Sequence, residues 1–373
     1  QRIDLLAARF YALNEVAALE LKIHDIETQL GVVRAYAVAE GKPTDVRIQK
    51  QGDPTRWGPM VRRGFPGFLR VNNAPRIPDD ASGRLQLAEW LTRPDHPLTA
   101  RVMVNRVWQW HFGKPLVATP SNFGVRGAYP THQRLLDWLA REFIDSGWSL
   151  KQLHRKILMS KTYRLATTGD PENNKIDPGN RWYWRFDRQR LDAESLRDAL
   201  LHVSGKLDLA RPGPHPFPPR SKYDFSQHKP FQAVYPSVHR SVYLMTQRFR
   251  RHPFLALFDG PDPNGSTAQR RTSMVPLQAL YMMNNDFVRD RADEFAVRLL
   301  KFSNSDSRRL EQAHLMAWNR SPREAEKRKA AEFLRLVKIQ LERQGRPAIR
   351  IEQEAWASYA RILFQANAFI FLD

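Results

Sequence analysis

The sequence contains no cysteine among its 373 residues. This absence excludes disulfide bonds, a thiolate nucleophile, zinc–thiolate sites and covalent attachment of a c-type haem within this chain. The sequence also has no run of 18 apolar residues, so it predicts no transmembrane helix. It shows no signal peptide, but it begins with Gln1 rather than Met. We therefore expect a fragment or a processed product, for which a missing signal says nothing about export.

Several motifs that mark common enzyme classes are absent as well. The chain has no G-x-S-x-G, no G-x-x-x-x-G-K-[ST] and no G-x-G-x-x-G, which argues against a serine hydrolase, a P-loop enzyme and a dinucleotide-binding protein of the usual kinds. The histidines are scattered and form no H-E-x-x-H pair. A zinc hydrolase therefore has little support from the sequence.

Positive charge is abundant. The chain has 59 Lys and Arg residues against 39 Asp and Glu residues, a formal net charge of +20. Such a surplus is typical of proteins with anionic partners, which include nucleic acid, acidic polysaccharide, an acidic protein and an anionic membrane surface. The 10 Trp and 20 Phe residues supply enough apolar surface for a folded core.

The periodicity of apolar residues predicts a mainly α protein, an irregular multi-helix domain with an N-terminal amphipathic helix and a small β-hairpin. The helix is expected over residues 1–30 and the hairpin over 32–39 and 45–49. We place a boundary near residue 50, so that 1–50 ends a preceding module or linker and 51–373 is the helical domain. The later helices are expected over 82–93, 97–112, 131–147, 192–203, 275–301, 321–344 and 352–368. A further helix is expected to begin at Ser149, and a short strand is expected at 240–246.

The helix expected over 97–112 is apolar on nearly every side, which is typical of a helix buried all round. It nevertheless contains Asn105, Arg106 and His111, and Asn105 shares a face with Trp108. A charge in a core needs a partner, because burying it alone is costly. Two interpretations remain open, a buried polar network and a binding site that includes Asn105 and Trp108.

Long motifs in this region carry a resemblance to a known family. They are N-R-V-W-Q-W-H-F-G, L-V-A-T-P-S-N-F-G and P-T-H-Q-R-L-L-D-W-L-A, followed by R-L-D-A-E-S-L-R-D-A-L, F-D-G-P-D-P-N and V-P-L-Q-A-L-Y-M-M-N-N-D-F-V. Over about residues 60–373 the chain resembles the planctomycete-type cytochrome c–associated C-terminal domain family. That family is a domain of unknown function found in large exported multidomain proteins.

The resemblance implies a setting rather than a mechanism. It implies a periplasmic, extracellular or cell-envelope location in a haem-linked multidomain assembly. The haem-bearing C-x-x-C-H of such proteins lies in a separate upstream domain, and this chain has none. Haem c is therefore expected only on another domain or on a partner subunit.

The loop around residues 258–264 is the most site-like stretch of the sequence. Asp259, Asp262 and Asn264 offer three oxygen ligands within six residues, which suits calcium. The twelve-residue calcium-loop pattern with its terminal Glu is absent, and the same residues are common in turns. The alternative is a turn paired with Arg270 and Arg271, which are also candidate binding residues.

A second constellation precedes and enters the helix expected at 192–203. Glu194 and Asp198 are spaced one helical turn apart, as are Arg190 and Glu194. A carboxylate pair can act in acid–base chemistry or glycoside cleavage, whereas this spacing is more often structural. Arg197 and Asp198 are also candidate partners for Arg106.

Aromatic and cationic residues alternate at 180–186. Trp182, Trp184 and Phe186 fit a strand with one buried face, and the same residue types are used to stack sugars or nucleic-acid bases. Core packing, carbohydrate contact and nucleic-acid contact all stay open for this segment.

The first functional hypothesis is a non-catalytic scaffold or interaction module that binds an acidic partner or an anionic glycan. The second is an enzyme acting on polysaccharide or another anionic substrate, and its candidate residues are Arg106, His111, Glu194, Arg197, Asp198 and Asp259. The third is nucleic-acid binding, which is disfavoured because no known nucleic-acid motif occurs.

Overall fold

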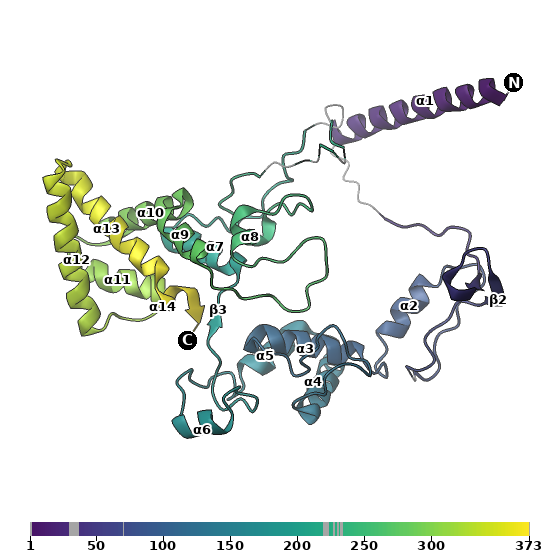
Figure 1. Cartoon of the computed structure of the whole chain (residues 1–373), viewed down its shortest axis with the longest axis horizontal. Helices are drawn as coiled ribbons and strands as arrows, with labels where there is room; N and C mark the ends of the chain where they lie inside the picture. The colour runs from purple at the N-terminus through teal and green to yellow at the C-terminus, as the bar shows by residue number, and fades with distance from the viewer. Residues whose placement is uncertain are drawn as a thin grey trace. The chain divides into compact units, whose positions relative to one another are not determined.

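The structure is a computed structural model that describes residues 2–29, 37–69, 71–218, 224–226, 228–229, 231 and 234–372 (Figure 1). It is mainly helical, as the sequence predicts. Within the described residues, the chain divides into two compact units. One unit comprises residues 1–99 with 215–230, and the other comprises 100–214 with 231–373.

The first unit contains helix α1 (Arg2–Gln29), strands β1 (Val46–Gln49) and β2 (Trp57–Val61), and helix α2 (Arg84–Leu91). The N-terminal helix is confirmed. The hairpin exists, but its predicted partner strand is wrong, because β1 pairs antiparallel with β2. The chain reverses at Gln51 and Gly52, whose φ angles of 55° and 78° are left-handed. Residues 37–39 form no strand, and 30–36 lie outside the described residues.

The second unit contains two core clusters in its described residues. The first is built by α3 (Thr99–Phe112), α4 (Gln133–Asp145) and α5 (Leu150–Leu158). Helix α3 ends as predicted, with Gly113 at a left-handed φ of 73°. The prediction that this helix is buried on every side is wrong, because Arg106 is exposed and Trp110 is 63% exposed.

The second core cluster is formed mainly by long helices from the C-terminal half. These are α7 (Ala193–Ser204), α9 (Pro276–Asn284), α10 (Asp286–Phe302), α11 (Asp306–Trp318), α12 (Glu324–Arg343) and α13 (Ala348–Gln365). Shorter elements complete the unit: α6 (Pro171–Ile176), α8 (Pro253–Leu257), α14 (Asn367–Ile370), and the strands β3 (Gln189–Arg190) and β4 (Phe371–Leu372). Strands β3 and β4 pair antiparallel through Gln189 with Leu372 and Arg190 with Phe371.

Several expected boundaries shift for local reasons. The single helix expected over 275–301 is interrupted at Asn285, whose side chain accepts a hydrogen bond from Phe287 N at 3.0 Å and caps α10. The expected strand at 240–246 is instead a 3₁₀ turn at Ser241–Tyr243. The cap predicted at Ser321 lies two residues later, where Glu326 accepts a hydrogen bond from the N–H of Arg323 at 2.7 Å.

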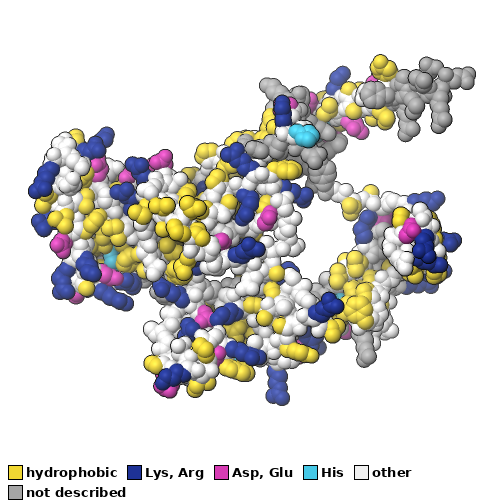
Figure 2. Space-filling model, viewed as in Figure 1, with side chains coloured by type: hydrophobic (Ala, Val, Ile, Leu, Met, Phe, Trp, Pro, Cys, Tyr) yellow, Lys and Arg dark blue, Asp and Glu magenta, His cyan; other side chains and the backbone are white. Residues whose placement is uncertain are grey.

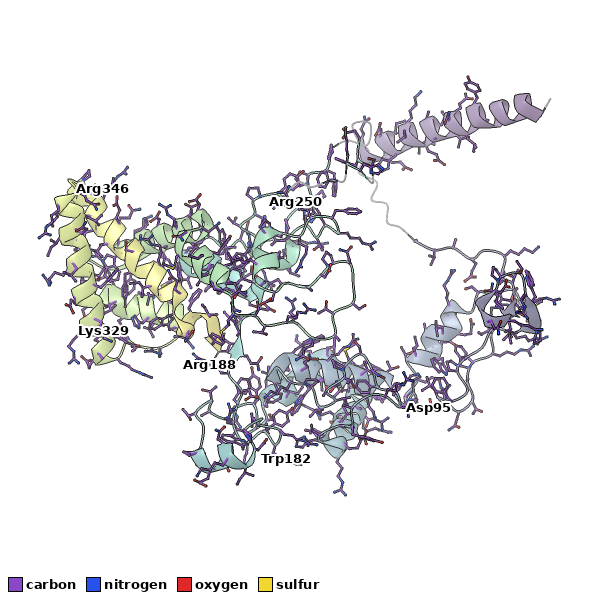
Figure 3. All side chains as sticks on the ribbon, in the orientation of Figure 1. Asp95, Trp182, Arg188, Arg250, Lys329 and Arg346 are labelled. Carbon is purple, nitrogen blue, oxygen red and sulfur yellow. The ribbon has the colours of Figure 1, made fainter. Side chains whose placement is uncertain are left out.

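The expected strand at 180–186 does not form either. Asn180 and Tyr183 take left-handed φ angles of 51° and 53°, which turn the chain. Trp182 is therefore 61% exposed on this segment (Figure 3). None of the helices in the described part of the chain has both the length and the apolar character needed to cross a bilayer.

Candidate functional site

Helix α7 positions the charged residues that the sequence singled out. Its N-cap is Asp192, which accepts a hydrogen bond from Ser195 N at 2.8 Å, and its end is set by Gly205 at a φ of 79°. Both ends confirm the prediction. The helix buries Leu196 and Leu200 in the second core and leaves Glu194 and Asp198 partly exposed. Arg190, by contrast, lies in β3 rather than on the helix, so its expected one-turn spacing to Glu194 is wrong.

Arg197 is held beneath the surface by a polar network. It is 3% exposed and donates to His239 O at 3.2 Å and to Ser241 Oγ at 3.1 Å. Asp198 accepts hydrogen bonds from Ser241 N at 2.8 Å and Ser241 Oγ at 2.6 Å. Burial lowers the pKa of Arg197, and the nearby Asp198 carboxylate counteracts it. Arg197 and Asp198 thus secure the turn at Ser241, and Arg106 is exposed rather than paired in a core.

Glu194 is engaged by a residue far away in the sequence. Arg270 donates from Nη1 to Glu194 Oε2 at 2.5 Å and from Nη2 to Glu194 Oε1 at 3.1 Å. The side chains are 40% and 25% exposed for Arg270 and Glu194 respectively. This two-point contact is the strong form of an arginine–carboxylate pair. Arg270 therefore pairs with Glu194, whereas the sequence offered it as a partner for the acidic loop at 258–264.

A large groove opens next to this pair. It has a volume of about 970 Å³ and is bounded by the end of α3, the segment 185–192, the loop 267–272 and strand β4. Among the described residues that line it, five are cationic: Lys114, Arg185, Arg188, Arg190 and Arg270. Two are acidic, Asp187 and Asp192. The groove is therefore net positive.

The contacts within the groove show how its charges are distributed. Asp187 forms ion pairs with two cations, Lys114 at 2.6 Å and Arg185 at 3.1 Å. Arg188 lies just before β3 (Figure 3). Its guanidinium carbon lies 4.8 Å from the ring centroid of Phe371. Arg190 donates to neutral groups, the carbonyl of Ser273 and Gln278 Oε1. The single carboxylate of Asp187 is thus shared by two cations, and positive charge remains in excess along the groove.

A smaller cavity of about 380 Å³ adjoins the groove. Asp192, Ser195, Pro261 and Arg270 line both spaces. Glu194, Asp198, Arg240, Arg251 and His252 line only the smaller one. The Glu194–Arg270 pair therefore stands where the two spaces meet. Burial, and then the charge of Arg197, lowers the pKa of His252 to about 4, so this imidazole is neutral near pH 7.

The candidate site residues Asn105, Trp108 and His111 of α3 make contacts at the first core cluster. Asn105 is fully buried, where Oδ1 accepts from Val117 N at 2.8 Å and Nδ2 donates to Val117 O at 3.2 Å. Trp108 Nε1 donates to the hydroxyl of Tyr183 at 2.8 Å. His111 Nε2 lies 2.7 Å from His154 Nδ1. Burial and the neighbouring His154 lower the pKa of His111. These contacts favour the interpretation of a polar network for Asn105 and Trp108.

The carboxylates of the proposed calcium site accept hydrogen bonds from nearby residues. Asp259 accepts from Ser273 N at 2.8 Å and from Ser273 Oγ at 2.9 Å. Burial raises the pKa of Asp259, but these hydrogen bonds outweigh it and hold that pKa below its usual value. Asp262 accepts from Asn264 N at 2.9 Å and Nδ2 at 3.1 Å. Within the described residues, no three His, Asp or Glu side chains gather in a way that suits a metal ion. The hydrogen bonds of Asp259 and Asp262 favour the turn interpretation.

The family comparison adds to this geometry. A model of the PSD1 family, described as a protein of unknown function (DUF1553), matches residues 83–334, which is more than half of the chain. The chain belongs to the PSD1 family. The resemblance to a domain of unknown function is thereby confirmed. No curated protein and no solved structure matches the chain.

Within this PSD1 chain, the groove brings together some predicted residues and several that the sequence did not reveal. Arg270 was predicted as a binding residue and lines the groove, whereas Arg271 is exposed nearby in the sequence. Trp110, Lys114, Asp187 and Arg188 were missed. Alternation of cations and aromatics around 180–186 was the signal closest to them, but it gave no indication that 185–192 faces the end of α3.

Proposed function

We propose that this chain is a non-catalytic binding module that holds an anionic polysaccharide in the groove beside α7. The observation that carries the proposal is the combination of excess positive charge with the exposed ring of Trp110 at the groove wall. Cations attract the carboxylates of an acidic glycan, and an exposed indole offers a flat apolar surface for a sugar ring. An acidic protein supplies the charge but needs no such ring.

The size of the groove supports an extended ligand. Its volume of about 970 Å³ is at the upper end of the range of about 300–1,000 Å³ that is usual for small-molecule sites. A glycan of several residues fills such a space. Lys and Arg side chains also spread over the visible face of the molecule, where Asp and Glu are fewer (Figure 2). Long-range attraction to a polyanion is therefore expected in addition to the local contacts.

We also propose the cellular setting of this module, an exported assembly that contains haem. We expect the module to work in an exported assembly in which a separate domain or a partner subunit bears the haem, because the family resemblance implies it and this chain has no cysteine to attach haem c. Purification from the native source with a haem stain tests this point. A haem-bearing chain that co-purifies is expected, and a haem-free preparation from intact cells argues against it.

The binding proposal is tested by calorimetry with oligogalacturonate and its neutral methyl ester. We expect binding of the acid that weakens as salt rises, and little binding of the ester. Trp110→Ala should weaken binding roughly tenfold through loss of ring contact. Trp182→Ala is the matched control, because Trp182 is similarly exposed at 61% and does not line the groove.

Two further ligands separate the alternatives. Polyglutamate stands for an acidic protein, and a single-stranded oligonucleotide stands for nucleic acid. Tighter binding of polyglutamate with no effect of Trp110→Ala would move the proposal to a protein partner. Tighter binding of the oligonucleotide with a steep salt dependence would move it to nucleic acid.

A further inference from the structure

The Glu194–Arg270 pair has a feature that an ordinary surface ion pair lacks. Arg270 lines both the groove and the smaller cavity, whereas Glu194 lines only the smaller cavity. The two terminal guanidinium nitrogens of Arg270, Nη1 and Nη2, donate to the two oxygens of one carboxylate, at 2.5 Å and 3.1 Å. A carboxylate on a ligand lying in the groove would engage the same two nitrogens in the same way.

We propose that Glu194 acts as an internal competitor at a carboxylate-binding subsite centred on Arg270. Its carboxylate holds the same two terminal nitrogens of Arg270 that a ligand carboxylate in the groove would bind. The ligand class is a carboxylate-bearing sugar, and the inference rests on the function proposed above. Glu194 thereby sets the affinity and the selectivity of the groove, since a ligand without a carboxylate cannot displace it.

Replacement of the Glu194 carboxylate by a ligand carboxylate leaves the charge of Arg270 balanced. When a ligand carboxylate pairs with Arg270, the carboxylate of Glu194 must find other cations or water. Arg240 and Arg251 line the same smaller cavity as Glu194, and Arg240 is exposed. The released carboxylate therefore stays in a cationic environment. Glu194 itself is 25% exposed, so it has room to move without disturbing the buried part of α7.

Two other carboxylates, at the N-cap of α7 and within it, have hydrogen-bond partners other than Arg270. Asp192 caps α7 through Ser195 N, and Asp198 is fixed by two hydrogen bonds from Ser241. Asp192 thus holds the start of α7, and Asp198 holds the turn at Ser241. Glu194 is the acidic residue of the first turn of α7 whose partner is a side chain from another segment, and it is therefore the one that a ligand displaces.

The test is the affinity of the full chain for oligogalacturonate after Glu194→Gln. Removing the competing charge should tighten binding by about 3–10-fold, because exposed and partly exposed ion pairs contribute modest free energies. Glu172→Gln is the matched control. It removes the same charge from α6, where Glu172 pairs with Lys175 and lines neither space. The control should leave the affinity unchanged.

The outcomes separate this inference from the function on which it rests. Unchanged or weaker binding by Glu194→Gln, while Trp110→Ala still weakens binding, overturns the inference and leaves the glycan-binding function standing. An equal gain for Glu172→Gln, or a gain with the neutral methyl ester, overturns it as well. If oligogalacturonate binds neither the wild type nor Glu194→Gln, the proposed function fails.

A second variant covers the case in which Glu194→Gln does not fold. Glu194→Asp keeps the charge but shortens the side chain by one methylene, so the two-point contact with Arg270 is weakened. We expect a smaller gain in affinity, of about 2–3-fold. Arg270→Gln should abolish the gain in combination with either variant. A gain that persists without Arg270 contradicts the subsite.

Discussion

Asn105→Ala tests whether the buried amide of α3 is structural. The side chain satisfies both backbone groups of Val117, which is itself 2% exposed. Alanine leaves the Val117 N–H and carbonyl without those partners in a dry core. Each orphaned buried group costs about 1–3 kcal/mol, so for the two groups we expect a loss of roughly 2–6 kcal/mol in the free energy of unfolding. Asn105→Asp should also destabilise, because a carboxylate has no donor for Val117 O.

The assay is urea denaturation followed by tryptophan fluorescence, combined with oligogalacturonate binding well below the melting temperature. We expect low stability with nearly unchanged affinity, since Asn105 does not line the groove. Asn122→Ala is a control, because Asn122 is exposed and its Oδ1 accepts from Gly124 N at 3.0 Å on the surface. A variant as stable as the wild type within 0.5 kcal/mol, or a loss of binding without destabilisation, would refute a structural role.

Three further predictions concern pH and local stability. Arg320 lowers the pKa of Glu326 to about 2, so the stabilisation from this carboxylate is fully present above pH 4.5 and is lost as the pH falls through 2. Glu326→Gln should cost about 1–2 kcal/mol at pH 7 after allowance for solvent screening, and its difference from the wild type should disappear only below pH 2. His252 is neutral when folded, with a pKa of about 4 against 6.5 when unfolded, so stability should fall between pH 6.5 and 4 and His252→Gln should flatten that part of the denaturation profile. Helix α1 exposes its side chains from Tyr11 to Ile23, so its amides should exchange with solvent far faster than those of α10. Equal protection of the two helices in the isolated chain would contradict this.

Local signals predicted much of the helical framework. Ser149 and Asp192 begin helices because their side chains accept backbone N–H groups, and Gly113 and Gly205 end helices because they take positive φ angles. Such signals lie within a few residues of the boundary that they set. The break at Asn285 was missed because the apolar periodicity continues across it, although an asparagine cap was present in the sequence.

The strands were harder to predict because their partners are decided by distant residues. Strand β1 was recognised, but its partner was placed on the wrong side of it. Strand β3 has only two residues, Gln189 and Arg190, and it forms because Phe371 and Leu372 reach it from the end of the chain. No periodicity develops over two residues. A strand of this kind, which helps to line the groove, is visible only in the structure.

The same reasoning separates the two main hypotheses for Glu194. From the sequence, Glu194 and Asp198 were candidates for a catalytic carboxylate pair because they lie one turn apart. In the structure each oxygen of Glu194 accepts from Arg270, and Asp198 accepts twice from Ser241. A carboxylate held this way is poorly placed to donate a proton to a leaving group. The variant Glu194→Gln therefore has opposite consequences in the two hypotheses. Catalysis requires that turnover be lost, whereas an internal competitor requires that the ligand bind more tightly.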